Sequence, residues 1–180
     1  MPIPKLLDLE EAAHVSELWQ RFGAKVVLVC GCFDLLHPGH IRLLKYARME
    51  GRILIVGINS DRSASKLKGE DRPILSAWVR AEILAGLDAV THVVVFDDPH
   101  PGRVLAALRP DVYVKGADYR ETTLPELLDQ SHIPKIVYAP YHTDFSTTAL
   151  LKHIDRNQNR ISPHLPWPQP YTEDSTDAGV

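Results

Sequence analysis

The sequence predicts an α/β fold, in which helices cover both faces of a doubly wound parallel sheet of about five strands. Short apolar runs alternate along the chain with helical stretches of roughly a dozen residues, as they do in βαβ units. The runs are apolar at consecutive positions, which is typical of strands that are buried on both faces. The composition, 44% hydrophobic and 24% charged over 180 residues, is ordinary for a globular protein.

The first elements show the pattern clearly. Asp8 and Glu11 have the spacing of a capping box and predict the start of a helix over residues 8–22, which Gly23 ends. The run Val26-Val27-Leu28-Val29-Cys30 predicts a buried strand that ends at Gly31.

The same alternation continues to the end of the globular part. After a helix from Ile41 to Met49, the predicted strands are 53–58, 92–96, 112–114 and 135–138. The predicted helices are 76–87, 103–108, a short segment at 125–128, and a closing helix that begins at Ser146. We expect residues 1–160 to form one domain, because the proline-rich residues 161–180 have the composition of an extended, flexible tail.

Charge and composition exclude several classes of partner. A net charge of −3 gives no overall attraction to nucleic acid or to anionic membranes. No apolar run approaches the roughly 20 residues that span a bilayer, and the polar N-terminal stretch predicts no signal peptide. The two cysteines, Cys30 and Cys32, are separated by one residue, and we expect them to be unpaired thiols in a reducing, cytoplasmic compartment.

The loop after the first long strand carries the strongest chemical signal. In an open parallel sheet, ligands bind outside the carboxyl ends of the strands. Here the sequence Gly31-Cys32-Phe33-Asp34-Leu35-Leu36-His37-Pro38-Gly39-His40 leads directly into a helix. The amino end of a helix attracts phosphate, two imidazoles can donate to phosphate oxygens, and Gly39 allows close approach to the backbone. The loop therefore predicts a phosphate site.

This segment resembles the signature of the cytidylyltransferase-like nucleotidyltransferase superfamily, whose members share the motif H-x-G-H. Four further segments match in order: Asn59 to Pro73, which includes Lys66 and Lys68, then Arg80, Val114-Lys115-Gly116-Ala117-Asp118-Tyr119, and Ser146-Thr147-Thr148. The resemblance extends from Leu6 to Ile154 and implies a Rossmann-like nucleotidyltransferase domain.

Within the superfamily, the chain is most similar to the branch that transfers AMP from ATP to heptose 1-phosphate, giving an ADP-sugar and pyrophosphate. The first alternative is a glycerol-3-phosphate-type cytidylyltransferase that uses CTP. Such enzymes have an arginine and a glycine where this chain has Tyr141 and Asp144, and this difference favours ATP. An FAD-forming adenylyltransferase and a non-catalytic nucleotide sensor are further alternatives.

The resemblance also implies roles for individual residues. The expected catalytic residues are His37, His40 and Lys66. The expected nucleotide-binding residues are Cys32, Phe33, Gly39, His40, Lys68, Arg80, Ser146, Thr147 and Thr148. The expected acceptor-binding residues are Asp34, Lys66, Lys115, Gly116 and Asp118, although Asp34 has the alternative role of ordering its own loop.

The expected reaction partners are ATP, which carries Mg²⁺, and a phosphorylated small molecule. Phosphates and water hold most of the coordination sphere of such a Mg²⁺ ion, so we predict no metal site made by the protein itself. We expect neither nucleic acid nor membrane as a partner, and the resemblance implies a homodimer. The polar stretch around Lys66 and Lys68 lacks apolar periodicity, and we expect it to be a mobile loop that closes over the substrates.

Overall fold

Both faces of the central sheet are buried, as the apolar runs predicted. The computed structural model describes residues 5–127, 130–140 and 145–156. Along the second strand, Val27 and Val29 belong to one buried cluster, and Val26 and Leu28 belong to the cluster on the opposite face. Because successive side chains of a strand point to opposite faces, an unbroken apolar run fills two cores at once.

The sheet has six parallel strands within the described residues, in the order β1-β4-β3-β2-β5-β6. The strands are β1 Leu6–Leu7, β2 Val26–Gly31, β3 Ile53–Asn59, β4 His92–Phe96, β5 Val112–Gly116 and β6 Lys135–Ala139. The predicted fold class is therefore confirmed, with one strand more than expected. The additional strand β1 pairs Leu6 with Val93 and Leu7 with Val94 at the edge of the sheet, and two residues are too few to give a sequence pattern.

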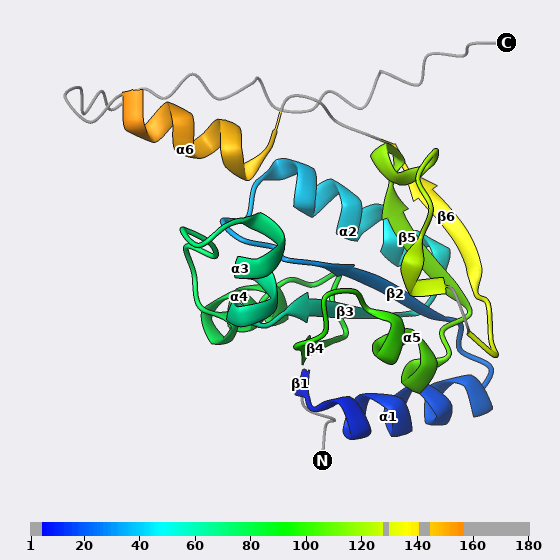
Figure 1. Ribbon diagram of the computed structural model, residues 1–180. Coiled ribbons are helices and arrows are strands. Elements are labelled where there is room, and N and C mark those ends of the chain that lie inside the picture. Colours follow the sequence, from blue (N-terminus) through cyan, green and yellow to red (C-terminus); the bar gives the residue numbers. More distant parts are fainter. Residues whose placement is uncertain (1–4, 128–129, 141–144, 157–180) are drawn as a thin grey trace, which may run out of the picture. The chain divides into compact units, whose positions relative to one another are not determined.

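Helices cover both faces of this sheet (Figure 1). They are α1 Leu9–Arg21, α2 Pro38–Glu50, α3 Asp61–Lys68, α4 Ala77–Ala85, α5 Gly102–Leu108 and α6 Thr147–Arg156, with short 3₁₀ helices η1 Ala117–Tyr119 and η2 Pro125–Leu127. The helices α1 and α5 pack on one face, and α2 and α4 pack on the other. The predicted capping box of α1 is present, because Glu11 N–H donates to Asp8 and Asp8 N–H donates to the Glu11 carboxylate.

The chain divides after Thr147 into two units, Met1–Thr147 and Thr148–Val180. The sheet and the helices α1 to α5 belong to the first unit, and most of α6 belongs to the second. The predicted boundary near residue 160 and the predicted tail 161–180 lie outside the described residues.

The segment that holds Lys66 and Lys68 is a helix, α3, and the expectation of a loop was wrong. The Ser60 hydroxyl caps the helix by accepting from the Ser63 N–H at 3.1 Å. The buried positions of α3 are Ser63 and Ala64, and Asn59 Nδ2 donates to Ser63 Oγ at 2.9 Å. Because the buried residues of α3 are a serine and an alanine, the helix has no stripe of large apolar residues that would mark it in the sequence.

The order of the strands fixes where a ligand crevice lies. From β2 the chain proceeds to β3 and β4 on one side, then crosses to β5 and β6 on the other side. The crevice of such a sheet opens at the carboxyl ends of the two strands where the direction reverses, which are β2 and β5 here. The motif GCFDLLHPGH begins at the last residue of β2, and VKGADY begins with the last three residues of β5.

The close pairing of β2 with β3 gives a testable consequence. Cys30 pairs with Gly57, and a Cβ atom on Gly57 would lie 2.7 Å from Cys30 Sγ. We expect Gly57→Ala to lower the free energy of unfolding by about 1–3 kcal/mol, the usual cost of overpacking a core, as measured by urea denaturation. On a Cys30→Ala background the cost should be smaller. An equal cost in both backgrounds would show that the sulfur is not the obstacle.

Candidate active site

The loop between β2 and α2 has an unusual backbone. Phe33 and Leu35 have φ values of 47° and 21°, although neither is glycine. Phe33 is buried and belongs to the core cluster beneath α2. Such conformations cost about 1–3 kcal/mol each and persist only where the surroundings impose them, as they often do at functional sites.

The carboxylate of Asp34 provides much of that restraint. It is 6% exposed and accepts hydrogen bonds from the backbone N–H of Leu35, Ile74 and Leu75 at 3.0–3.2 Å and from Arg72 Nη1 at 3.0 Å. Burial alone would raise the pKa of Asp34, but these hydrogen bonds outweigh it and hold the pKa below its usual value. Asp34 thus fastens its loop to residues 72–75, the ordering role that was the alternative for this residue.

His37 and His40 lie together at the amino end of α2. Their rings are stacked, with centroids 3.8 Å apart and an angle of 23° between the planes. Helix α2 begins at Pro38, so the two residues are three positions apart across the first turn. A Cβ atom on Gly39 would lie 3.0 Å from the His37 ring, a tight contact that would push the ring from this position by a few tenths of an ångström.

The two imidazoles are neutral near pH 7. Burial and, secondarily, the neighbouring His37 lower the pKa of His40 to about 3, against a smaller opposing effect of Asp34. Burial also lowers the pKa of His37. Within the described part of the chain, Nδ1 of each ring is buried and has no hydrogen-bond partner. A buried polar atom without a partner is costly, and two of them lie together at the amino end of α2.

Arg80 is a buried framework residue. It is 1% exposed and donates to Leu75 O at 2.9 Å, to Cys32 O at 2.6 Å and to Asp61 Oδ1 at 2.8 Å. Its guanidinium therefore joins the loop after β2 to the start of α3 and to the segment before α4. This geometry favours a positioning role over direct contact with a nucleotide.

Lys66 and Lys68 are exposed in the last turn of α3. Lys68 is close enough to the loop after β2 for its positive charge to affect the thiol of Cys32. Burial raises the pKa of Cys32, and the positive charge of Lys68 partly opposes that shift. The Cys32 thiol donates to Asn59 Oδ1 at 3.6 Å, which ties the ends of β2 and β3 together.

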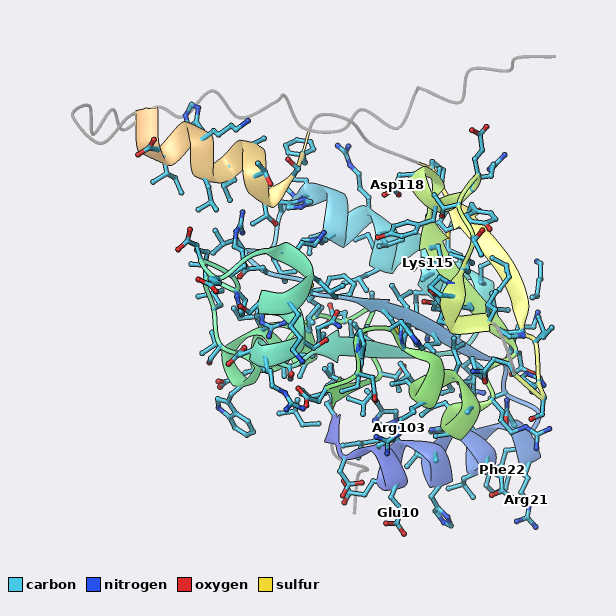
Figure 2. All side chains as sticks on the ribbon, viewed as in Figure 1. Glu10, Arg21, Phe22, Arg103, Lys115 and Asp118 are labelled. Atoms are coloured by element: carbon cyan, nitrogen blue, oxygen red, sulfur yellow. The ribbon has the colours of Figure 1, made fainter. Side chains whose placement is uncertain are left out.

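The carboxyl end of β5 carries a second group of polar side chains, which includes Lys115 of β5 and Asp118 of η1, both labelled in Figure 2. Lys115 Nζ lies 3.0 Å from Glu126 Oε1 and 3.9 Å from the centre of the Tyr119 ring. The Tyr113 hydroxyl donates to the same Glu126 oxygen at 3.0 Å. Glu126 belongs to no local sequence motif and was not predicted, because it reaches this group from η2.

The Ser-Thr-Thr segment is divided between the two units of the chain. Helix α6 begins at Thr147, and the Thr147 hydroxyl donates to Asp34 O at 3.4 Å. Thr147 thus contacts the loop that carries the histidines. Thr148 belongs to the second unit.

The described residues contain neither a cluster of metal-ligating side chains nor a membrane-spanning helix. In residues 5–127, 130–140 and 145–156, no group of three or more His, Cys, Asp or Glu side chains is arranged to hold a metal ion. No helix in this part of the chain combines the length and the apolar character that crossing a membrane requires.

Comparison with known sequences identifies relatives over most of the chain. The model of the family described as cytidylyltransferase-like matches residues 28–162. The bifunctional protein HldE of Gluconobacter oxydans is 44% identical over 148 residues, which is 82% of this chain and 31% of that protein. The bifunctional protein HldE of Helicobacter pylori strain HPAG1 is 42% identical over 158 residues, 87% of this chain and 32% of that protein. The chain thus spans about a third of the length of these relatives.

Solved structures share the fold at low sequence identity. A lipopolysaccharide core biosynthesis protein from Thermoplasma volcanium superimposes with a TM-score of 0.54 and 23% identity, covering 67% of this chain and 99% of that one. A pantoate-beta-alanine ligase from Francisella tularensis superimposes with a TM-score of 0.57 and 18% identity, covering 78% of this chain and 68% of that one.

The neutral state of His40 predicts a dependence of stability on pH. The pKa rises from about 3 in the folded protein to 6.5 when the chain unfolds, so the unfolded state binds more protons between these values. The free energy of unfolding should therefore fall as the pH is lowered below 6.5, by at most about 1.4 kcal/mol per pH unit for this one proton.

Urea denaturation from pH 7.5 to pH 5 measures this slope. The slope of the free energy of unfolding against pH should be flatter in His40→Asn, because asparagine cannot titrate. An identical slope in the wild type and the variant would contradict the neutral, buried state of this ring.

Proposed function

Because the chain belongs to the cytidylyltransferase-like family, we propose that it is a nucleotidyltransferase that moves AMP from ATP onto a sugar 1-phosphate, heptose 1-phosphate. In this reaction an oxygen of the acceptor phosphate attacks the α-phosphorus of ATP. The bond from that phosphorus to the β-phosphate oxygen breaks, and pyrophosphate leaves. The observation that carries the proposal is the stacked pair of neutral histidines, with unpartnered buried nitrogens, at the amino end of α2.

The nucleotide side of the site is built around that pair. His37 and His40 would donate to the α-phosphoryl and leaving oxygens, where negative charge grows in the transition state. The amino end of α2 adds the partial positive charge of its backbone N–H groups, and Gly39 leaves room for a phosphate. We propose that Cys32, Phe33, Lys68, Ser146 and Thr147 complete the nucleotide site.

The acceptor side lies between the ends of α3 and β5. Lys66 would bind the acceptor phosphate, since it is an exposed cation, and Lys115, Gly116 and Asp118 would contact the rest of the acceptor. Asp34 and Arg80 hold the loop between them, because their own polar groups are occupied by protein atoms. Positioning of both substrates supplies much of the catalysis in such a transfer.

The identity of the substrates rests on the motifs. The resemblance of GCFDLLHPGH, VKGADY and Ser-Thr-Thr to the heptose 1-phosphate branch supports the acceptor, and the similarity to HldE proteins agrees with it. Tyr141 and Asp144, in place of arginine and glycine, support ATP over CTP. Mg²⁺ would arrive with the ATP, held mostly by phosphates and water. A homodimer, a cytoplasmic location and the absence of nucleic acid and membrane partners are also part of the proposal.

Pyrophosphate release tests this function directly. Each nucleoside triphosphate is crossed with a panel of acceptors that includes heptose 1-phosphate and glycerol 3-phosphate. We expect turnover with ATP and a sugar 1-phosphate, and a higher kcat/KM for ATP than for CTP with a common acceptor. A clear preference for CTP with glycerol 3-phosphate would assign the chain to the alternative cytidylyltransferase class, and no turnover with any pair would favour a nucleotide sensor.

Variants of the two histidines test their role in the same assay. Because the two imidazoles act on the transition state, His37→Ala and His40→Ala should each lower kcat on the order of 10²–10³-fold. Folding and nucleotide binding should change much less. Turnover near that of the wild type in either variant would remove the proposed active site.

The lysines of α3 give a separate prediction. Since both are exposed at the end of a helix, Lys66→Ala and Lys68→Ala should lower kcat/KM while leaving the melting temperature nearly unchanged. Lys→Arg should restore activity only partly, because a planar guanidinium does not reproduce a compact ammonium. Lys45→Ala, an exposed lysine of α2, serves as the control. Full activity in both alanine variants would exclude these lysines from the site.

A further inference from the structure

The end of β5 contains an ion pair that neutralises the lysine expected to meet the acceptor. Tyr113 and Lys115 are two positions apart on β5, so their side chains lie on the same face of the sheet. Both donate to one oxygen of Glu126, which is 4% exposed. Burial would raise the pKa of Glu126, but its hydrogen bonds and the charge of Lys115 hold the pKa below its usual value, so the carboxylate is ionised.

The same strand end carries a second carboxylate. The Asp118 side chain folds back over the backbone of Gly116, where a Cβ atom would collide with it. Asp118 is exposed, so this carboxylate is open to a ligand. The next cation along the chain, Arg120, has its guanidinium over the Tyr138 ring of β6. Tyr138 is the register partner of Lys115, so Arg120 belongs to the same strand end. Lys115 and Arg120 carry two positive charges there and Glu126 and Asp118 carry two negative charges, which leaves a net charge of about 0 by ordinary ionisation states.

Such a site is poorly suited to a phosphate group. Because the charges balance, the strand end has no overall attraction for an anion, and the ammonium of Lys115 already has a carboxylate and an aromatic ring as partners. Carboxylates accept hydrogen bonds from hydroxyl groups, and an ammonium with three donors can still offer one to a hydroxyl oxygen. The chemistry at the end of β5 therefore matches a neutral, hydroxyl-rich group.

We propose that the end of β5 binds the hydroxyl-bearing sugar part of the acceptor and not its phosphate, and that Glu126 is the positioning residue that makes this possible by neutralising and holding Lys115. This inference rests on the proposed function. It assigns the acceptor phosphate to Lys66, which is exposed on α3, and it identifies the acceptor as a polyhydroxylated phosphate.

The test measures inhibition by inorganic phosphate, competitive with the acceptor, in the heptose 1-phosphate reaction. Glu126→Gln keeps the shape and an oxygen that accepts from Tyr113, but it releases the charge of Lys115. We expect the Ki of phosphate to fall and the KM of the acceptor to rise, each on the order of fivefold, the effect of one unit charge in a partly solvated site. The KM of ATP should stay within about twofold on the same basis.

Three variants separate this role from a structural one. Tyr113→Phe removes the other hydrogen bond to the same oxygen without changing charge, and it should leave both constants unchanged. Asp118→Asn, at an exposed position, should raise the KM of the acceptor and lower the Ki of phosphate. The double variant Lys115→Met with Glu126→Gln should return the Ki of phosphate to its wild-type value.

Each outcome decides the proposal. An unchanged Ki of phosphate in folded Glu126→Gln overturns it, and so does an equal shift in Tyr113→Phe, which would show a packing effect. If Glu126→Gln does not fold, Asp118→Asn decides, and unchanged constants in that variant overturn the proposal. Failure of the proposed function is distinct, since the wild type would then release no pyrophosphate with heptose 1-phosphate.

Discussion

The burial of both faces of the parallel sheet is the constraint from which the other features follow. A strand with an apolar core on each side has no place for an unpaired polar side chain along its length. Polar chemistry is therefore confined to the carboxyl ends of the strands, where the histidine loop and the β5 loop meet the crevice. Tyr113 and Lys115, whose side chains enter the core face, are accommodated because Glu126 accepts from both.

Two buried charged side chains hold the loops around the crevice in place. Asp34 joins the histidine loop to residues 72–75, and Arg80 joins the same loop to the start of α3. Both side chains are almost fully buried, and their partners are mostly backbone groups from different elements. Because an unsatisfied buried charge is expensive, these contacts fix the relative positions of the loops within narrow limits. The backbone conformation of Phe33 and Leu35 is held by the same contacts.

The sequence predicted the elements whose signal is local. The apolar runs located five strands, the spacing of Asp8 and Glu11 located the start of α1, and GCFDLLHPGH located the loop at the crevice. It did not reveal β1, which exists only because Leu6 and Leu7 pair with β4, or α3, whose burial falls on Ser63 and Ala64. Glu126 and the framework role of Arg80 depend on contacts between elements distant in the chain, which neither composition nor periodicity records.

The stacked histidines also make the properties of the site depend on the pH of the solution. Each ring is kept neutral by its burial, and the two rings share one small space. An anion placed against them favours their charged forms and raises both pKa values. A polyphosphate bound at the proposed site would therefore be accompanied by uptake of protons at any pH that the raised pKa values reach. In that range the affinity would depend on pH, and the heat of binding would depend on the buffer that supplies the protons.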